Sequence, residues 1–115
     1  MLLIHYPRCS TCQKAKKYLD DKIIKYIERN IKENPPTYEE LKYYLTLTDK
    51  QINKFFNTSG LKYRELNLKD KISKMTEEEK LRLLSSDGML IKRPLLVDKE
   101  FILIGFKIKE YQEKF

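Results

Sequence analysis

Two cysteines, Cys9 and Cys12, are the residues of this chain best suited to chemistry. They are the only cysteines among its 115 residues, and they form the motif Cys9-Ser10-Thr11-Cys12. A thiolate is a good nucleophile, and a second thiol one helical turn later can displace whatever the first one binds. The spacing therefore predicts a redox pair in which Cys9 is the nucleophile and Cys12 the resolving thiol.

Other uses of the cysteine pair remain open at this point. A structural zinc site needs four ligands, and only His5 could join the two thiols, so we expect no metal. Two inert, buried thiols would act as small apolar side chains. A disulfide framework is excluded, because it needs more than one pair of cysteines.

The elements around Cys9 favour the redox interpretation. The apolar run Leu2–Tyr6 predicts a buried strand, and the helix formers that follow Ser10 predict a helix. Cys9 then lies at the start of a helix, where free N–H groups and the positive end of the helix dipole favour a thiolate. The neighbouring Arg8 acts in the same direction, so we expect Cys9 to be more acidic than a free thiol and Cys12 less so.

The middle of the chain predicts one more strand and then a block of helices. Residues 23–28 alternate in polarity and predict a second strand. Residues 31–88 carry no strand pattern. Their helices are indicated by three capping-box signatures, which begin at Thr37, Thr48 and Thr76. Gly88 is expected at the C′ position of the last helix.

The end of the chain returns to strands. Leu95–Val97 and Phe101–Ile104 predict a hairpin, and a short helix follows it to Phe115. The order β-α-β, helices, β-β-α predicts an α/β fold with a thioredoxin-like (glutaredoxin-like) mixed sheet and an inserted helical subdomain. We expect residues 1–30 and 89–115 to form the core and residues 31–88 the insertion.

Composition limits the partners and the location. Lysine and arginine number 24 against 17 acidic residues, a net charge of +7, but the basic residues are scattered. No zinc-finger spacing, basic zipper or RNP-like stretch is present, so we expect no direct nucleic-acid binding. Apolar runs fall far short of the ~20 residues of a membrane span, and no secretory signal is visible. We expect a cytoplasmic protein with no membrane contact, and a monomer.

Several segments, in order along the chain, carry a family resemblance. They are Tyr6–Ala15, Phe56–Gly60 followed by Tyr63–Leu66, Ile91–Leu95 and Ile104–Phe106. Together they resemble the ArsC/Spx family, the arsenate-reductase-like branch of the thioredoxin-fold proteins. The resemblance covers almost the whole chain, and it implies a thioredoxin-like core, a helical insertion and a cytoplasmic location.

Three functions are consistent with this resemblance. The first is a thiol–disulfide oxidoreductase, in which Arg93 stabilises the Cys9 thiolate or an oxyanion. The second is an Spx-type redox-sensing transcription regulator that binds the RNA polymerase α subunit. The third is a glutaredoxin-dependent arsenate reductase. Against the third, only Arg93 keeps the place of a family arginine, whereas Asn57 and Phe106 stand where others are expected.

The resemblance also implies which residues form the site. Cys9, Cys12 and Arg93 are expected to be catalytic, and the substrate is expected to contact Arg8, Ser10, Thr11, Asn57 and Pro94. The bond between Arg93 and Pro94 is expected to be cis, with Arg93 facing Cys9. We expect no bound cofactor, although glutathione, glutaredoxin or thioredoxin could serve as the reductant. The substrate would be a protein thiol or disulfide, or a small oxyanion.

Overall fold

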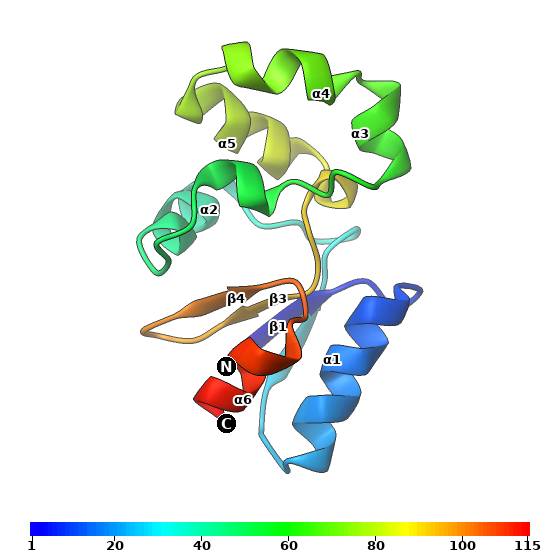
Figure 1. The fold of residues 1–115 in the computed structure, drawn as a ribbon, viewed down its shortest axis with the longest axis vertical. Coiled ribbons are helices and arrows are strands. Elements are labelled where there is room, and N and C mark those ends of the chain that lie inside the picture. Colours follow the sequence, from blue (N-terminus) through cyan, green and yellow to red (C-terminus); the bar gives the residue numbers. More distant parts are fainter.

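A computed structural model describes the whole chain, residues 1–115, as a small sheet between two sets of helices (Figure 1). The strands are β1 (Leu2–His5), β2 (Ile27–Asn30), β3 (Leu95–Val97) and β4 (Ile102–Ile104). The helices are α1 (Ser10–Asp21), α2 (Tyr38–Leu45), α3 (Leu61–Glu65), α4 (Leu68–Lys71), α5 (Glu77–Ser86) and α6 (Ile108–Lys114). Short 3₁₀ helices are η1 (Ile52–Phe55), η2 (Ile72–Lys74) and η3 (Gly88–Leu90).

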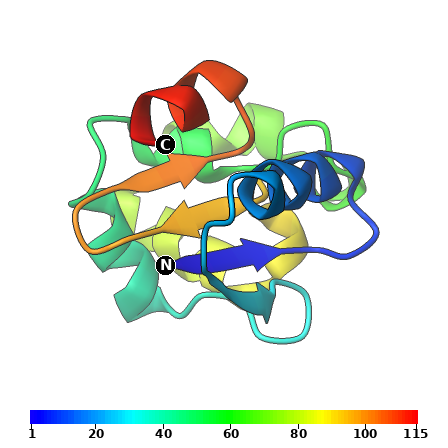
Figure 2. The ribbon, with the colours of Figure 1, turned by 90° about the horizontal axis from the view of Figure 1, so that it is seen from below.

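The sheet is mixed, and its strands lie side by side in the order β2-β1-β3-β4 (Figure 2). β1 runs parallel to β2 and antiparallel to β3, and β3 forms an antiparallel hairpin with β4. The β-α-β start and the β-β-α end expected from the sequence are therefore both present. The hairpin and the final helix are confirmed at nearly the predicted residues.

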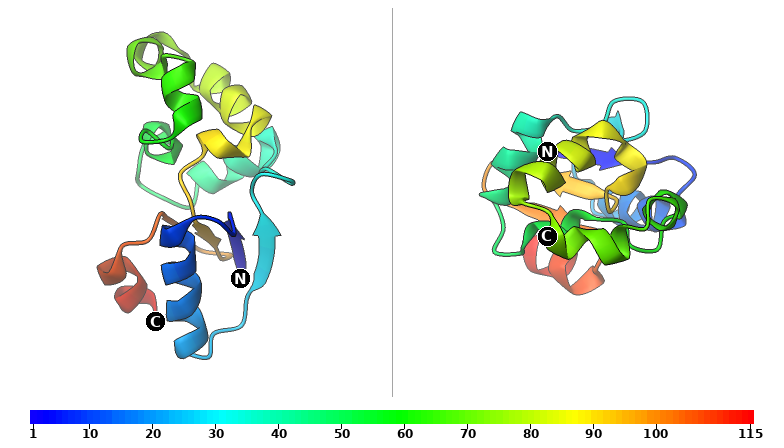
Figure 3. Two further views of the ribbon diagram at one scale, coloured as in Figure 1. Left: turned by 90° about the vertical axis from the view of Figure 1, so that its right-hand side faces the viewer. Right: turned by 90° about the horizontal axis from the view of Figure 1, so that it is seen from above.

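Helices cover both faces of the sheet, with α1 and α6 on one face and α2 to α5 on the other (Figure 3). Successive side chains of each strand point to opposite faces of the sheet, because the strand is pleated. Leu3 and Leu96 pack toward α1 and α6, whereas Ile4 and Leu95 belong to the larger core under the helical insertion. Because both faces are covered, the inner strands β1 and β3 are apolar except for His5 at the end of β1.

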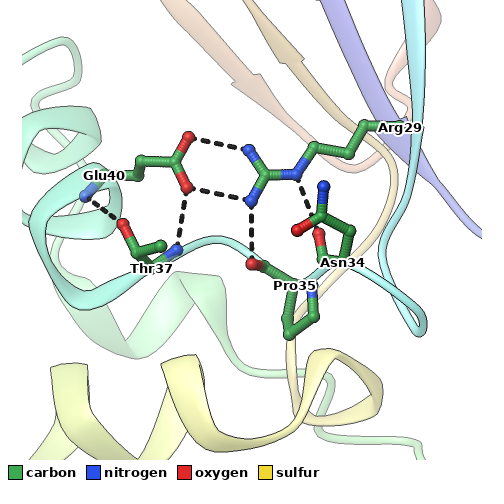
Figure 4. A network of polar contacts seen from close by, with 5 residues as sticks. All are labelled: Arg29, Asn34, Pro35, Thr37 and Glu40. Atoms are coloured by element: carbon green, nitrogen blue, oxygen red, sulfur yellow. Dashed lines mark hydrogen bonds and ion pairs between the residues drawn. The ribbon is translucent and has the colours of Figure 1, made fainter.

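A network of polar contacts joins the sheet to the helical insertion (Figure 4). The Arg29 guanidinium, on β2, forms two bonds with the Glu40 carboxylate of α2, at 2.7 and 2.9 Å. It also donates to the carbonyls of Asn34 and Pro35, each at 2.8 Å. Glu40 completes a capping box with Thr37, so one carboxylate both caps the helix and holds the strand.

The second strand starts later than the sequence predicts. The second strand begins at Ile27, not at Ile23, because the intervening residues form the turn that leaves α1. Ile23 has a φ of 58° and is 88% exposed, and the Ile24 N–H is bonded back to the Leu19 carbonyl. A chain segment tied to the end of a helix cannot at the same time pair with β1.

Two residues that were predicted to begin or end a helix have other roles. Thr48 caps no helix, because its hydroxyl accepts from the Lys50 N–H and η1 begins only at Ile52. Gly88 is not a left-handed C′ residue, because it begins η3. Its requirement is space, since a Cβ atom there would lie 1.8 Å from the carbonyl oxygen of Ile31.

Candidate active site

Cys9 occupies the N-cap position of α1, at the junction with the loop that leaves β1. The backbone fixes this junction, because the Cys9 N–H donates to the Tyr6 carbonyl at 3.0 Å and the Gln13 side chain donates to the Pro7 carbonyl at 2.8 Å. The Cys9 thiol makes no capping hydrogen bond, and the first turn of α1 holds no acidic residue. The positive end of this helix is therefore available to a negative charge on sulfur.

The two thiols differ in exposure and in acidity. Both are free, with Cys9 partly exposed and Cys12 fully buried. Burial opposes ionisation of Cys9, but interactions with the Cys12 amide and thiol and with the Arg93 charge outweigh it and hold its pKa below the usual value. Burial and the neighbouring Cys9 raise the pKa of Cys12 to about 12. The pKa values of the two thiols thus differ in the predicted direction, with Cys9 the more acidic.

The cation that favours the Cys9 thiolate is Arg93, not Arg8. The Arg93–Pro94 bond is cis, as expected, and the Arg93 guanidinium lies over the Tyr6 ring, 5.5 Å from its centroid. Its Nε and Nη1 atoms are buried and have no hydrogen-bond partner in the protein. Buried guanidinium donors without partners are costly, so they are well placed to receive an anion.

Cys9 and Arg93 line a common cleft of about 390 Å³. Polar residues and main chain form most of its wall, and no acidic residue contributes to it. The remaining lining residues are Thr11, Asn57, Ser59, Gly60, Lys92, Ile104, Gly105, Phe106 and Lys107.

Asn57 reaches this cleft through backbone pairing between distant segments. The Asn57 N–H donates to the Leu90 carbonyl at 2.8 Å, and the Lys92 N–H donates to the Phe55 carbonyl at 2.7 Å. These bonds place the end of η1 beside the segment that leads into β3. Asn57 and Arg93, 36 residues apart by number, therefore line one wall.

The structure separates the predicted substrate-binding residues into two groups. Thr11 and Asn57 line the cleft, whereas Pro94 is buried and does not line it. Ser10 is exposed outside the cleft, and Arg8 lines a separate hollow together with Lys32 and other residues. Neither Ser10 nor Arg8 therefore lines the cleft that holds Cys9 and Arg93.

Two lysines of the cleft, Lys92 and Lys107, were not among the residues predicted from the sequence to form the site. Lys92 lies within one segment that carried the family resemblance, Ile91–Leu95, and Lys107 directly follows another, Ile104–Phe106. A lysine has no local signal that separates a cleft position from an ordinary exposed one. Their position beside motif residues was the one signal available.

Neither a metal site nor a membrane span is found in the structure. No group of three His, Cys, Asp or Glu side chains is arranged to hold a metal ion. The His5 Nε2 atom lies 2.9 Å from the Glu28 carboxylate. None of the helices combines the length and the apolar character that crossing a membrane requires.

Comparison with known proteins assigns the family and agrees with the fold. The sequence profile of the ArsC family matches residues 4–114. This chain belongs to the ArsC family. Its mixed sheet with flanking helices is the thioredoxin-like fold of that family.

Individual members of the ArsC family resemble the chain along nearly its whole length. The uncharacterized protein YusI of Bacillus subtilis is 53% identical over 108 residues, which cover 94% of this chain and 92% of YusI. The regulatory protein MgsR of Bacillus subtilis is 40% identical over 101 residues, covering 88% and 79%. The crystal structure of a possible arsenate reductase from Streptococcus mutans has a TM-score of 0.91 and 44% identity, covering 99% and 97%.

Proposed function

We propose that this ArsC-family chain is a cytosolic thiol–disulfide oxidoreductase, with Cys9 as nucleophile and Cys12 as resolving thiol. The observation that carries the proposal is the contrast between the two sulfurs. One is partly exposed, lies at a helix start beside Arg93 and has a lowered pKa. The other is buried one turn later with a raised pKa. An accessible thiolate followed by a protected thiol is the arrangement that disulfide exchange requires.

The first step is attack on a disulfide in the substrate. The Cys9 thiolate bonds to one substrate sulfur, the substrate S–S bond breaks, and the other sulfur leaves as a thiolate. The Arg93 guanidinium favours the ionised form of Cys9 before attack and can donate to the negative charge as it develops on sulfur.

The second step releases the substrate. Cys12 gives its proton to the departing substrate sulfur and attacks the Cys9 sulfur, which breaks the mixed disulfide and forms the Cys9–Cys12 bond. Two electrons have then passed from the chain to the substrate disulfide. A thiol reductant such as glutathione, glutaredoxin or thioredoxin supplies two electrons to restore both thiols.

A redox-regulatory role is a second candidate, favoured by the 40% identity to MgsR, a regulatory protein. In that case the same Cys9–Cys12 exchange would change a protein surface instead of serving a substrate. The partner would be the RNA polymerase α subunit, as for Spx-type regulators. Reversible, redox-dependent binding of that subunit by the purified chain is the measurement that would favour this role.

Arsenate reduction is less well supported by the cleft. Arsenate capture relies on planar, bidentate donors, and Arg93 is the one arginine that lines it. Asn57 supplies an amide without charge. We expect weak or absent arsenate turnover with glutathione and glutaredoxin supplied, and turnover at micromolar arsenate would contradict this assignment.

The proposed function is tested by trapping substrate on Cys9. Cys12→Ser removes the resolving thiol, so a mixed disulfide on Cys9 should accumulate in lysate and be released by dithiothreitol. The control is the double variant with Cys9→Ser, which should trap nothing. Reduction of a model disulfide peptide with a thioredoxin or glutaredoxin system gives the activity. A wild-type protein that neither turns over disulfides nor forms the Cys9–Cys12 bond in oxidising glutathione buffer would refute the proposal.

A further inference from the structure

A second hollow continues from the Cys9 cleft and is strongly basic. It has a volume of about 340 Å³, and it shares Lys92, Ile104 and Lys107 with the cleft. On its far side it adds Lys50 and Lys54, which do not line the Cys9 cleft. We refer to the cleft and this outer hollow together as the basic groove.

The positive charge of the basic groove is largely unbalanced. No acidic residue lines either hollow. Lys50 is paired with Glu110 at 2.9 Å, but Lys54, Lys92 and Lys107 make no ion pair with the protein. Like charges gathered around a concave surface raise the local concentration of anions and strengthen their capture.

The glycine that follows β4 leaves room for one of these lysines. Gly105 has a φ of +77°, and a Cβ atom there would lie 2.9 Å from the Lys92 Cε atom. The Lys92 side chain therefore lies directly along the glycine, between the two hollows. A larger residue at this position would displace the lysine from the groove.

At the end of the groove beside Cys9, two hydrogen-bond donors of Arg93 have no acceptor in the protein. Arg93 presents buried Nε and Nη1 atoms that no protein group satisfies. The donors of the groove therefore extend from Arg93, beside Cys9, through Lys92 and Lys107 to Lys54. A single small oxyanion beside Cys9 would use only the first part of this series.

We propose that the basic groove binds an acidic polypeptide segment, in which carboxylates flank the disulfide that Cys9 attacks. This rests on the proposed function, and it assigns the class of substrate. The peptide sulfur lies at Cys9, and its neighbouring carboxylates are met by Arg93 and by the lysines of both hollows. Polypeptide is favoured over a small anion because the outer hollow adds the unpaired Lys54, which does not line the Cys9 cleft.

The test compares two disulfide peptides that differ only in charge. Each is a short disulfide-linked peptide, with Glu on both sides of the cysteine in one and Gln in the other. With the full chain and its reductant at low salt, kcat/KM should be about tenfold higher for the Glu peptide. The ratio should fall toward one as salt rises to about 0.5 M, because salt screens exposed charges.

Lys54→Gln separates binding in the outer hollow from chemistry at Cys9. We expect it to lower the ratio of kcat/KM for the Glu peptide to kcat/KM for the Gln peptide about threefold at low salt. The alkylation rate of Cys9 should stay the same. Lys99→Gln is the matched control, because Lys99 is also exposed and unpaired but lies at the turn between β3 and β4, outside the groove.

A binding measurement keeps the two proposals distinguishable. Fluorescence anisotropy with Ser-substituted, non-reactive versions of both peptides should show tighter, Lys54-dependent binding of the Glu peptide, whether or not disulfides are reduced. Equal binding and equal rates for the two peptides would overturn the groove assignment and leave the oxidoreductase proposal standing. If Lys54→Gln slowed the reduction of glutathione disulfide as much as that of the Glu peptide, the groove would be assigned to small anions and the polypeptide proposal would be overturned. Stronger competition by a single-stranded oligonucleotide than by the Glu peptide would also overturn it.

Discussion

The N-termini of α1 and α2 have the same backbone arrangement and opposite chemistry. At α2, the Thr37 hydroxyl accepts from the Glu40 N–H at 3.1 Å, and the Glu40 carboxylate accepts from the Thr37 N–H at 2.9 Å. Glu39 and Glu40 add negative charge to its first turn. At α1, Cys9 makes no capping bond, and no acidic residue is present in the first turn.

This difference separates a structural helix end from a reactive one. At α2 the free amides and the helix dipole are satisfied by groups of the protein itself, so they contribute to stability. At α1 the corresponding amides remain available to the Cys9 sulfur, and they favour its ionised form. The Cys9 thiol does not cap α1. When the thiol loses its proton, the negative sulfur gains the favourable interaction with the N–H groups and the helix dipole.

The largest expected effect comes from giving α1 the kind of cap that α2 has. Cys9→Ser should lower disulfide reductase activity by at least about 10³-fold, because the thiolate is lost. The same change should raise the free energy of unfolding by about 0.5 kcal/mol, since serine is a better N-cap than a thiol. Peptide-disulfide reduction and guanidinium chloride unfolding measure the two effects. If Cys9→Ser instead lowered the free energy of unfolding, the conclusion that α1 lacks a stabilising N-cap would be wrong.

The second prediction removes the double role of Glu40 at α2. Glu40→Gln should destabilise the protein by about 1–2 kcal/mol at pH 7, a value reduced for the partial solvent screening of this ion pair. Asp21→Asn is the control, because its pair with Lys17 is exposed and should be worth less than about 0.5 kcal/mol. Urea unfolding of both variants gives the comparison, and equal losses would contradict it.

The Glu40 contribution should also depend on pH in a defined direction. Arg29, then the Thr37 N–H and hydroxyl, outweigh burial and lower the pKa of Glu40 to about 2. A carboxylate with a lowered folded-state pKa stabilises fully above its unfolded value of about 4.3. The stability difference between wild type and Glu40→Gln should therefore shrink as pH falls from about 5 toward 2. A difference that is constant over this range would refute the assigned cause.

The third prediction tests which cation serves the α1 end. Arg93→Ala should raise the pKa of the Cys9 thiol and slow its alkylation several-fold at a pH below that pKa, because the nearby positive charge is lost. Arg8→Ala should leave the pH profile of alkylation unchanged. The profile of iodoacetamide alkylation, recorded with Cys12→Ser in the background, separates the two. A larger shift from Arg8→Ala than from Arg93→Ala would reverse the assignment.

The smallest expected effect concerns the other capped helix, α5. Thr76 accepts a hydrogen bond from the Glu79 N–H at 3.1 Å. Thr76→Ala should cost about 1 kcal/mol of stability and leave the alkylation profile of Cys9 unchanged, because this cap is only structural. Thermal unfolding and Cys9 alkylation check both parts. A change in Cys9 reactivity would mean that the helical insertion transmits strain to the site.

Sequence alone determined the features whose physical cause lies within a few residues. The Cys9–Cys12 spacing, the helix start at Ser10 and the capping boxes at Thr37 and Thr76 are each satisfied inside one helical turn. The hairpin of β3 and β4 is similarly local. These predictions held because no distant residue is needed to satisfy them.

Local signals failed where a distant contact or a competing local bond decided the outcome. Gly88 resembles a helix terminator in the sequence, but it is required for close approach to the backbone of Ile31. Thr48 shows a capping signature, but its hydroxyl bonds to the Lys50 N–H outside any helix. In both cases the residue type correctly indicated a special backbone position. The group that the residue contacts could not be deduced from the sequence.

The charges of the active site were decided by the tertiary structure. Arg8 is adjacent to Cys9 in sequence, but the loop directs it elsewhere, and Arg93 takes its place beside the sulfur. Lys54 lies in η1, within the helical insertion, and Lys107 precedes α6, yet both line one hollow. Charges interact through space over several ångströms, so their effect depends on which residues the folded chain brings together. The spacing of residues along the sequence does not specify this.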